Sequence, residues 1–150
     1  MKIKKILLGI GCLALLLVFT GCEKKTAITT EEFIAKAEKL NYEITEGTKE
    51  SGIKESKVAI SSEGYSVYFY VMESKKEAIQ MFEEKKMEAE NKKGNMTNET
   101  SINVSNYSAY TVSSGGRYIH ICRVDNTLFF TEVKETEKES VKQLIKEIDY

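Results

Sequence analysis

The stretch of sequence that decides the fold is residues 65–72, Tyr65-Ser66-Val67-Tyr68-Phe69-Tyr70-Val71-Met72. It is rich in β-branched and aromatic side chains, which favour strands. Neighbouring side chains of a strand point to opposite faces. One face would therefore carry Tyr65, Val67, Phe69 and Val71, and the other Ser66, Tyr68, Tyr70 and Met72. Because both faces are largely apolar or aromatic, the stretch is expected to be a central strand of a sheet.

The residues before this strand complete a β-hairpin. Val58-Ala59-Ile60 is expected to form its first strand, and Ser62-Glu63-Gly64 its turn. Residues 46–57 are polar and glycine-containing, which indicates a loop. Residues 42–45 are a candidate short strand.

Three segments, residues 29–40, 74–91 and 136–148, have the apolar spacing of amphipathic helices. Each opens with the pattern of a capping box, in which a Ser or Thr hydroxyl and a Glu three residues later satisfy free backbone amides. The three pairs are Thr29 with Glu32, Ser74 with Glu77, and Thr136 with Glu139. The sequence therefore predicts three helices with defined starts.

Three more strands are expected at residues 107–113, 117–124 and 127–133, separated by turns at Ser114-Gly115-Gly116 and Asp125-Asn126. Residues 92–106, rich in Asn, Thr and Ser, indicate a surface loop. The resulting order is helix, two strands, helix, three strands, helix. It predicts an α+β fold, with an antiparallel sheet of about five strands packed by three amphipathic helices.

The first twenty-two residues have the layout of an export signal. Lys2, Lys4 and Lys5 form a positive end, residues 6–21 carry no charge, and Glu23-Lys24-Lys25 follow at once. The uncharged run is shorter than the about 18 to 20 residues that a membrane-spanning helix needs. A signal that is removed or modified is therefore favoured over a permanent membrane span.

The end of this segment, Val18-Phe19-Thr20-Gly21-Cys22, resembles the lipobox of bacterial lipoprotein precursors, although it has Phe19 where Leu is usual. The resemblance implies cleavage between Gly21 and Cys22 and a diacylglycerol thioether on the Sγ of Cys22. Residues 1–21 would be the signal peptide, residues 22–28 the lipidated cysteine with a short tether, and residues 29–150 a single α+β domain. The alternative is a plain secretory signal in which Cys22 is incidental.

Charge and cysteine content exclude some classes of partner and of covalent cross-link. Loss of Lys2, Lys4 and Lys5 would leave 19 of the 22 basic residues against 23 acidic ones, a formal charge of about −4. A mildly acidic surface argues against nucleic acid as a partner, because nucleic-acid binding needs clustered Lys and Arg. Of the 3 cysteines, Cys12 lies in the signal and Cys22 would carry lipid. Cys122 therefore stands alone, and no internal disulfide can form in the mature chain.

His120 and Cys122 are the one pair of chemically reactive residue types that the strand pattern places close together. On a strand both side chains would project from one face about 6 to 7 Å apart, within reach of a shared metal or of each other. No second His and no second free Cys completes a metal site, and no third group orients the pair for catalysis. We therefore expect no cofactor and no metal, with Cys122 filling the core and His120 hydrogen-bonded in the sheet.

Tyr68 and Tyr70 share one strand face and form a candidate interaction surface, since Tyr offers amphipathic contact area. Burial of both side chains under a helix is the favoured explanation. Ser113-Ser114-Gly115-Gly116-Arg117 joins two expected strands and leads into no helix, so it indicates a hairpin turn and not a phosphate loop.

These features favour a membrane-anchored lipoprotein on the outer face of the cell membrane that acts as a non-catalytic binding or interaction module. Its partners would be the membrane, through Cys22, and an unidentified protein or small ligand. Two alternatives stay open. One is an exported enzyme or enzyme accessory that uses His120 and Cys122, and the other is a cell-surface inhibitor or immunity factor. The abundance of Lys, Glu and Asn without Trp or Pro is typical of a low-GC Gram-positive source.

Overall fold

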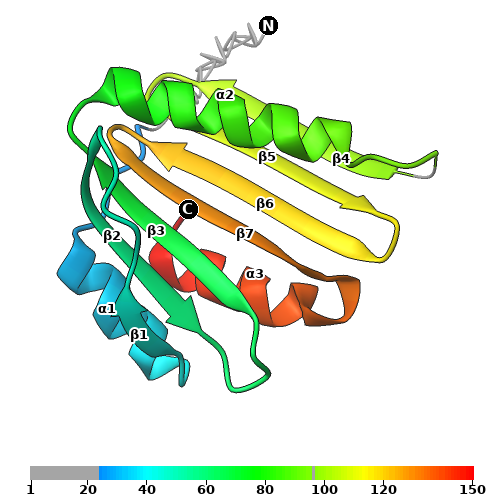
Figure 1. Ribbon diagram of the computed structural model, residues 1–150, viewed down its shortest axis with the longest axis horizontal. Coiled ribbons are helices and arrows are strands. Elements are labelled where there is room, and N and C mark those ends of the chain that lie inside the picture. Colours follow the sequence, from blue (N-terminus) through cyan, green and yellow to red (C-terminus); the bar gives the residue numbers. More distant parts are fainter. Residues whose placement is uncertain (1–23, 96) are drawn as a thin grey trace, which may run out of the picture.

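The computed structural model describes residues 24–95 and 97–150 (Figure 1). The expected signal peptide, residues 1–21, and Cys22 lie outside the described residues. The elements are α1 (Thr30–Lys39), β1 (Glu43–Glu46), β2 (Ile53–Ile60), β3 (Ser66–Met72), α2 (Lys75–Asn91), β4 (Thr97–Val104), β5 (Tyr107–Ser114), β6 (Arg117–Val124), β7 (Thr127–Lys134), the 3-10 turn η1 (Glu135–Glu137) and α3 (Lys138–Ile148). No helix within the described ranges is long and apolar enough to cross a membrane.

The described strands form one antiparallel sheet in the order β1-β2-β3-β7-β6-β5-β4. β3, the strand quoted first above, is internal, because it pairs with β2 on one side and with β7 on the other. Residue Phe69 lies opposite Lys57 of β2 and Phe129 of β7. The chain thus builds one meander of three strands and one of four, and α2 connects them.

The prediction of about five strands in the order helix, two strands, helix, three strands, helix is wrong. The described residues contain seven strands, in the order helix, three strands, helix, four strands, helix. β4 occupies most of the segment that was expected to be a surface loop. It is an edge strand whose only strand partner among the described residues is β5, and nearly all of its side chains are exposed on both faces. It therefore lacks the apolar alternation by which a half-buried strand is recognised.

α1 and α3 cover one face of the sheet, and α2 covers part of the other (Figure 1). Under α1 the ring of Phe33 stacks on the ring of Phe69, with centroids 4.6 Å apart. Under α2 the buried side chains of Ala78, Phe82 and Ala89 belong to a second apolar cluster with strand residues such as Ile121. Each face of the sheet thus contributes its own hydrophobic layer.

Not all of the three expected capping boxes are present at the helix starts. The capping box of Thr29 and Glu32 is confirmed, with both reciprocal hydrogen bonds present. Ser74 caps α2 and accepts a hydrogen bond from the backbone N–H of Glu77. The third prediction, Thr136 with Glu139, is wrong, because η1 begins at Glu135 and the carboxylate of Glu137 accepts a hydrogen bond from the backbone N–H of Lys134.

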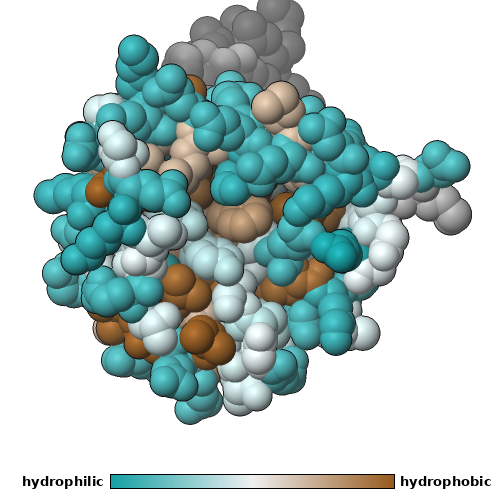
Figure 2. Space-filling view, viewed as in Figure 1, coloured by the Kyte–Doolittle hydropathy of each residue, from teal (hydrophilic) through white to brown (hydrophobic). Residues whose placement is uncertain are grey.

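On the face of the sheet where α2 packs, no helix among the described residues covers β2 and β3 (Figure 1). Several apolar and aromatic side chains on that half remain partly exposed, among them Val58, Ile60, Tyr68 and Phe130. The space-filling view shows hydrophobic groups at the surface over this hairpin, surrounded by hydrophilic ones (Figure 2). This open half of the sheet is where a candidate site is found.

Candidate functional site

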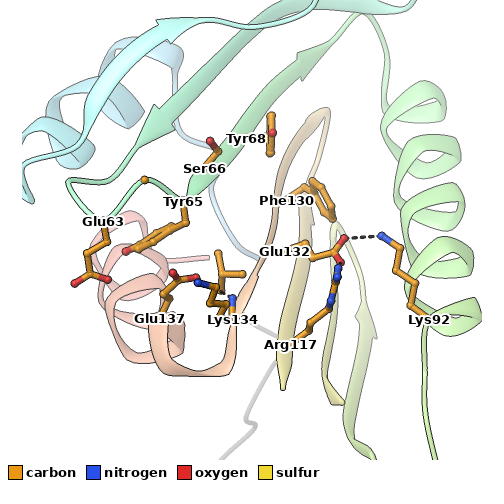
Figure 3. Close-up of a pocket in the computed structure, with 12 residues that line it drawn as sticks. Glu63, Tyr65, Ser66, Tyr68, Lys92, Arg117, Phe130, Glu132, Lys134 and Glu137 are labelled. Atoms are coloured by element: carbon orange, nitrogen blue, oxygen red, sulfur yellow. Dashed lines mark hydrogen bonds and ion pairs between the residues drawn. The ribbon is translucent and has the colours of Figure 1, made fainter. Parts of the chain in front are cut away.

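A groove of about 620 Å³ opens on the α2 side of the sheet, beside the end of α2 (Figure 3). Its volume falls within the range of sites that bind small molecules. The lining combines strand residues of β3 and β7 with residues of the β2–β3 turn, the start of β6 and the end of α2. These lining residues are Glu63, Gly64, Tyr65, Ser66, Tyr68, Lys92, Arg117, Phe130, Glu132, Val133, Lys134 and Glu137.

The floor of the groove is aromatic. Tyr68 on β3 lies opposite Phe130 on β7, and their ring centroids are 5.8 Å apart. Tyr68 also stacks against Tyr70, with centroids 6.4 Å apart and ring planes within 6° of parallel. The ammonium group of Lys85 lies 5.3 Å from the centroid of the Phe130 ring. These contacts hold the rings of the floor in place before any ligand binds.

One rim is an ion-paired cluster around Glu132 of β7. Its carboxylate accepts hydrogen bonds from the Nζ of Lys92, at 2.6 Å, and from the guanidinium of Arg117 (Figure 3). Partial burial alone would favour the neutral acid. The hydrogen bonds and charges of Lys92 and Arg117 outweigh this effect and hold the pKa of Glu132 below its ordinary value. Glu132 is therefore a charged acceptor fixed beside the aromatic floor.

The opposite rim is formed by the β2–β3 turn and by the start of η1. Glu63 of the turn is exposed, and Lys134 and Glu137 lie where β7 runs into η1. Tyr65 supports the turn from below, because its hydroxyl lies 2.8 Å from the hydroxyl of Tyr42 in a buried pair. Together the two rims carry three acidic and three basic side chains, so the charge of the groove is balanced.

The two tyrosines proposed as an interaction surface have different environments. Tyr68 is partly exposed in the groove, whereas Tyr70 is buried at 8% exposure. Burial, together with the nearby Tyr68 and Glu50, raises the pKa of Tyr70 to about 12. Tyr68 can therefore contact a ligand directly, and Tyr70 supports it from the side.

His120 and Cys122 are buried on the other face of the sheet, away from the groove. Cys122 has no exposed surface and belongs to the apolar cluster under α1 and α3. The ring of His120 stacks on Tyr118 and meets Phe129 edge-on. Within the described ranges no group of three or more His, Cys, Asp or Glu side chains could hold a metal ion.

Sequence reasoning missed most of the groove. Phe130, Glu132, Lys92 and Arg117 lie on three different elements. The pairing of β3 with β7 brings Phe130 and Glu132 next to Tyr68, the pairing of β6 with β7 adds Arg117, and the packing of α2 on the sheet adds Lys92. Tyr68 and Phe130 are 62 positions apart in the chain, so their pairing leaves no local pattern. The alternation on residues 65–72 was the one available signal, and it identified Tyr68.

Comparison with known proteins supports the fold and does not extend to a function. A crystal structure of a GTP binding regulator from Thermotoga maritima is similar, with a TM-score of 0.50 and 19% sequence identity over 83% of this chain and 90% of that chain. No protein-family model matches the sequence, and no curated protein matches it. At this identity the likeness concerns the arrangement of helices and strands alone.

Proposed function

We propose that this protein is a lipid-anchored, extracytoplasmic binding module, held at the membrane by Cys22, that binds a ligand in the groove without transforming it. The N-terminal pattern supports the anchor. The observation that carries the binding function is the groove itself, in which a preformed aromatic floor lies between two charged rims. Convergent polar groups around an apolar floor are the usual form of a ligand site.

The chemistry of the groove favours an uncharged, hydroxyl-rich ligand such as a glycan. The negatively charged faces of the Tyr68 and Phe130 rings suit the C–H groups of a sugar ring. Carboxylates such as Glu132 accept hydrogen bonds from hydroxyl groups, and Lys92, Arg117 and Lys134 donate them. Because three acidic and three basic side chains balance, a ligand with a strong charge of either sign would meet as much repulsion as attraction.

The alternative of an exported enzyme based on His120 and Cys122 gains no support from the geometry. Both side chains are buried, and they face the helices of the opposite layer and not the groove. A cell-surface inhibitor or immunity factor would use the same exposed surface to bind a protein. We therefore treat that alternative as an outcome of the binding test.

The anchor and the groove are tested separately. Cells that express the full chain are fed an alkyne-labelled fatty acid, and the wild-type protein should carry the label and sediment with membranes, whereas Cys22→Ser should do neither. A wild-type protein that carries no labelled fatty acid would overturn the proposed lipid anchor.

For the groove, residues 22–150, which contain the whole described fold, are tested for binding to cell-wall polysaccharide and to a glycan array. Tyr68→Ala should weaken binding about tenfold or more, because it removes the ring that stacks on the ligand. Tyr68→Phe keeps the ring and should bind nearly as well as the wild type. Absence of glycan binding would overturn the ligand class, and a protein retained by the wild type but not by Tyr68→Ala would favour the inhibitor alternative.

A further inference from the structure

The first described residues, 24–28, lie against the folded domain. The backbone carbonyl of Lys25 accepts a hydrogen bond of 2.7 Å from the Nδ2 of Asn106. The Nζ of Lys25 donates to the carbonyl of Asp149 at 2.8 Å and lies 4.9 Å from the centroid of the Tyr107 ring. Lys25 is therefore held by the turn before β5 and by the C-terminal end of the chain.

The next residues are packed as well. The side chains of Ala27 and Ile28 are partly buried against the apolar cluster under α1 and α3. The backbone N–H of Ile28 donates to the hydroxyl of Tyr150 at 3.3 Å, and that hydroxyl also bonds to Thr127. The segment that sequence analysis assigned to a tether thus has polar and apolar contacts along residues 25–28.

The surface that receives this segment is itself fixed by a polar network. Asn106 is buried, and its Nδ2 donates a second hydrogen bond to Asp125 at 2.9 Å. The guanidinium of Arg123 donates to the backbone carbonyls of Asn106 and Asp125. Lys75 at the start of α2 pairs with Asp125 at 2.6 Å. We call this surface, formed by Asn106, Asp125 and the groups bonded to them, the docking site. It connects the β4–β5 turn, the β6–β7 turn and the start of α2.

We infer that residues 25–28 form a docked stalk that fixes the orientation of the domain on the membrane, with the end around Asn106, Asp125 and Asp149 against the lipid surface and the groove facing away from it. This inference rests on the proposed lipid anchor at Cys22. Between Cys22 and Lys25 the chain can extend at most about 10 Å. This short connection therefore limits how far the domain can rotate relative to the membrane.

The strand directions place the groove at the far end. β7 runs from Thr127, beside the docking site, to Lys134 in the rim of the groove. The 8 residues of β7, at about 3.4 Å each, put about 25 Å between these two ends. In Figure 1 the described chain starts near the upper ends of the strands, and the β2–β3 and β5–β6 turns lie at the lower ends. The groove would thus be open to large extracellular ligands.

The docking is tested first in residues 22–150 without lipid, so the result does not depend on the anchor. Hydrogen exchange at the amide of Ile28, which donates to the hydroxyl of Tyr150, should be slow in the wild type. Asn106→Ala should speed it about fivefold, the effect of losing one hydrogen bond, and Tyr150→Phe should do the same at Ile28. Asn98→Ala on the exposed strand β4 is the control. An unprotected Ile28 amide in the wild type would overturn the inference.

The orientation is tested with the lipidated protein in vesicles that contain a nitroxide-headgroup lipid. A dye on Lys76→Cys, beside the docking site, should be quenched severalfold more than a dye on Ser62→Cys, in the β2–β3 turn. Asn106→Ala should reduce this difference. Equal quenching at both sites in the otherwise unchanged protein would overturn the inference. A mass spectrum without lipid on Cys22 would instead refute the proposed anchor, and the exchange result would still stand.

Discussion

Thr111 of β5 and His120 of β6 face one another, and the Oγ1 of Thr111 lies 2.7 Å from the Nδ1 of His120. The other ring nitrogen, Nε2, is buried and has no hydrogen-bond partner within residues 24–95 and 97–150. A second proton on this ring would have to be buried between the rings of Tyr118 and Phe129. His120 is therefore held as a neutral imidazole in the core.

The first prediction concerns stability below neutral pH. Burial lowers the pKa of His120 to about 4, from an ordinary value of 6.5. Between these two values the unfolded chain binds more protons than the folded chain does, so stability falls as the pH drops from 6.5 towards 4. The loss should reach about 3 kcal/mol, measured by urea unfolding at a series of pH values.

The control for this prediction is His120→Phe, which keeps an aromatic ring and removes the titrating group. Its stability should change much less between pH 6.5 and 4.5 than that of the wild type. A nuclear magnetic resonance titration that gave the folded protein a His120 pKa near 6.5 would contradict the prediction.

The second prediction is that the thiol of Cys122 does not react in the folded protein. Burial raises the pKa of this thiol to about 12, and the nearby Tyr107 and Lys25 offset only part of the rise. The thiolate is the reactive form, so at pH 8 Ellman's reagent should not titrate Cys122 in Cys22→Ser chains of residues 22–150 until urea unfolds them. Ser62→Cys in the same background supplies an exposed thiol that should react at once. Rapid reaction of native Cys122 would revive the enzyme hypothesis.

The sequence predicted elements well where one side of a segment is buried. Residues 74–91 became α2 within one residue, because Ala78 and Phe82 mark a buried stripe. Asn41, which follows the C-cap of α1, takes a positive φ of 63°, a conformation that Asn tolerates better than most residues. In each case the local pattern and the tertiary contacts favour the same conformation.

The sequence failed where strand formation depends on a neighbour. β4 is one edge of the sheet, and nearly all of its side chains are exposed. Backbone hydrogen bonds to β5 hold it, and a backbone hydrogen bond has no signature in the choice of side chain. The other edge, β1, was expected at residues 42–45 and spans Glu43–Glu46. The groove was missed for a related reason, since Glu132 and Lys92 meet only once β7 and α2 are in place.

The third prediction concerns Gly47, which precedes β2 and donates a backbone hydrogen bond to Ser56 at 3.0 Å. A Cβ atom at Gly47 would lie 1.9 Å from the Oγ and 2.9 Å from the Cβ of Ser56, a buried residue. Gly47→Ala should therefore lower the free energy of unfolding by about 1 to 3 kcal/mol, measured by urea denaturation. At Gly94 the nearest atom would be 3.5 Å away, so Gly94→Ala is the control and should cost much less. Equal effects of the two substitutions would contradict the steric argument.

The last prediction separates the two roles that Glu132 could have. Its partners Lys92 and Arg117 have side chains that are 49% and 65% exposed, so the ion pairs should add less than about 1 kcal/mol to stability. Glu132→Gln should therefore fold normally and leave the groove with one excess positive charge. Measured on a glycan array, it should gain binding to carboxylated glycans relative to neutral ones, whereas Glu139→Gln, in an exposed pair with Lys142, should not. The contrary result would be that Glu132→Gln lowers the unfolding free energy by more than about 2 kcal/mol and leaves the preference between carboxylated and neutral glycans unchanged. The ion-paired cluster around Glu132 would then serve stability alone, and the proposal that the groove binds the ligand would be refuted.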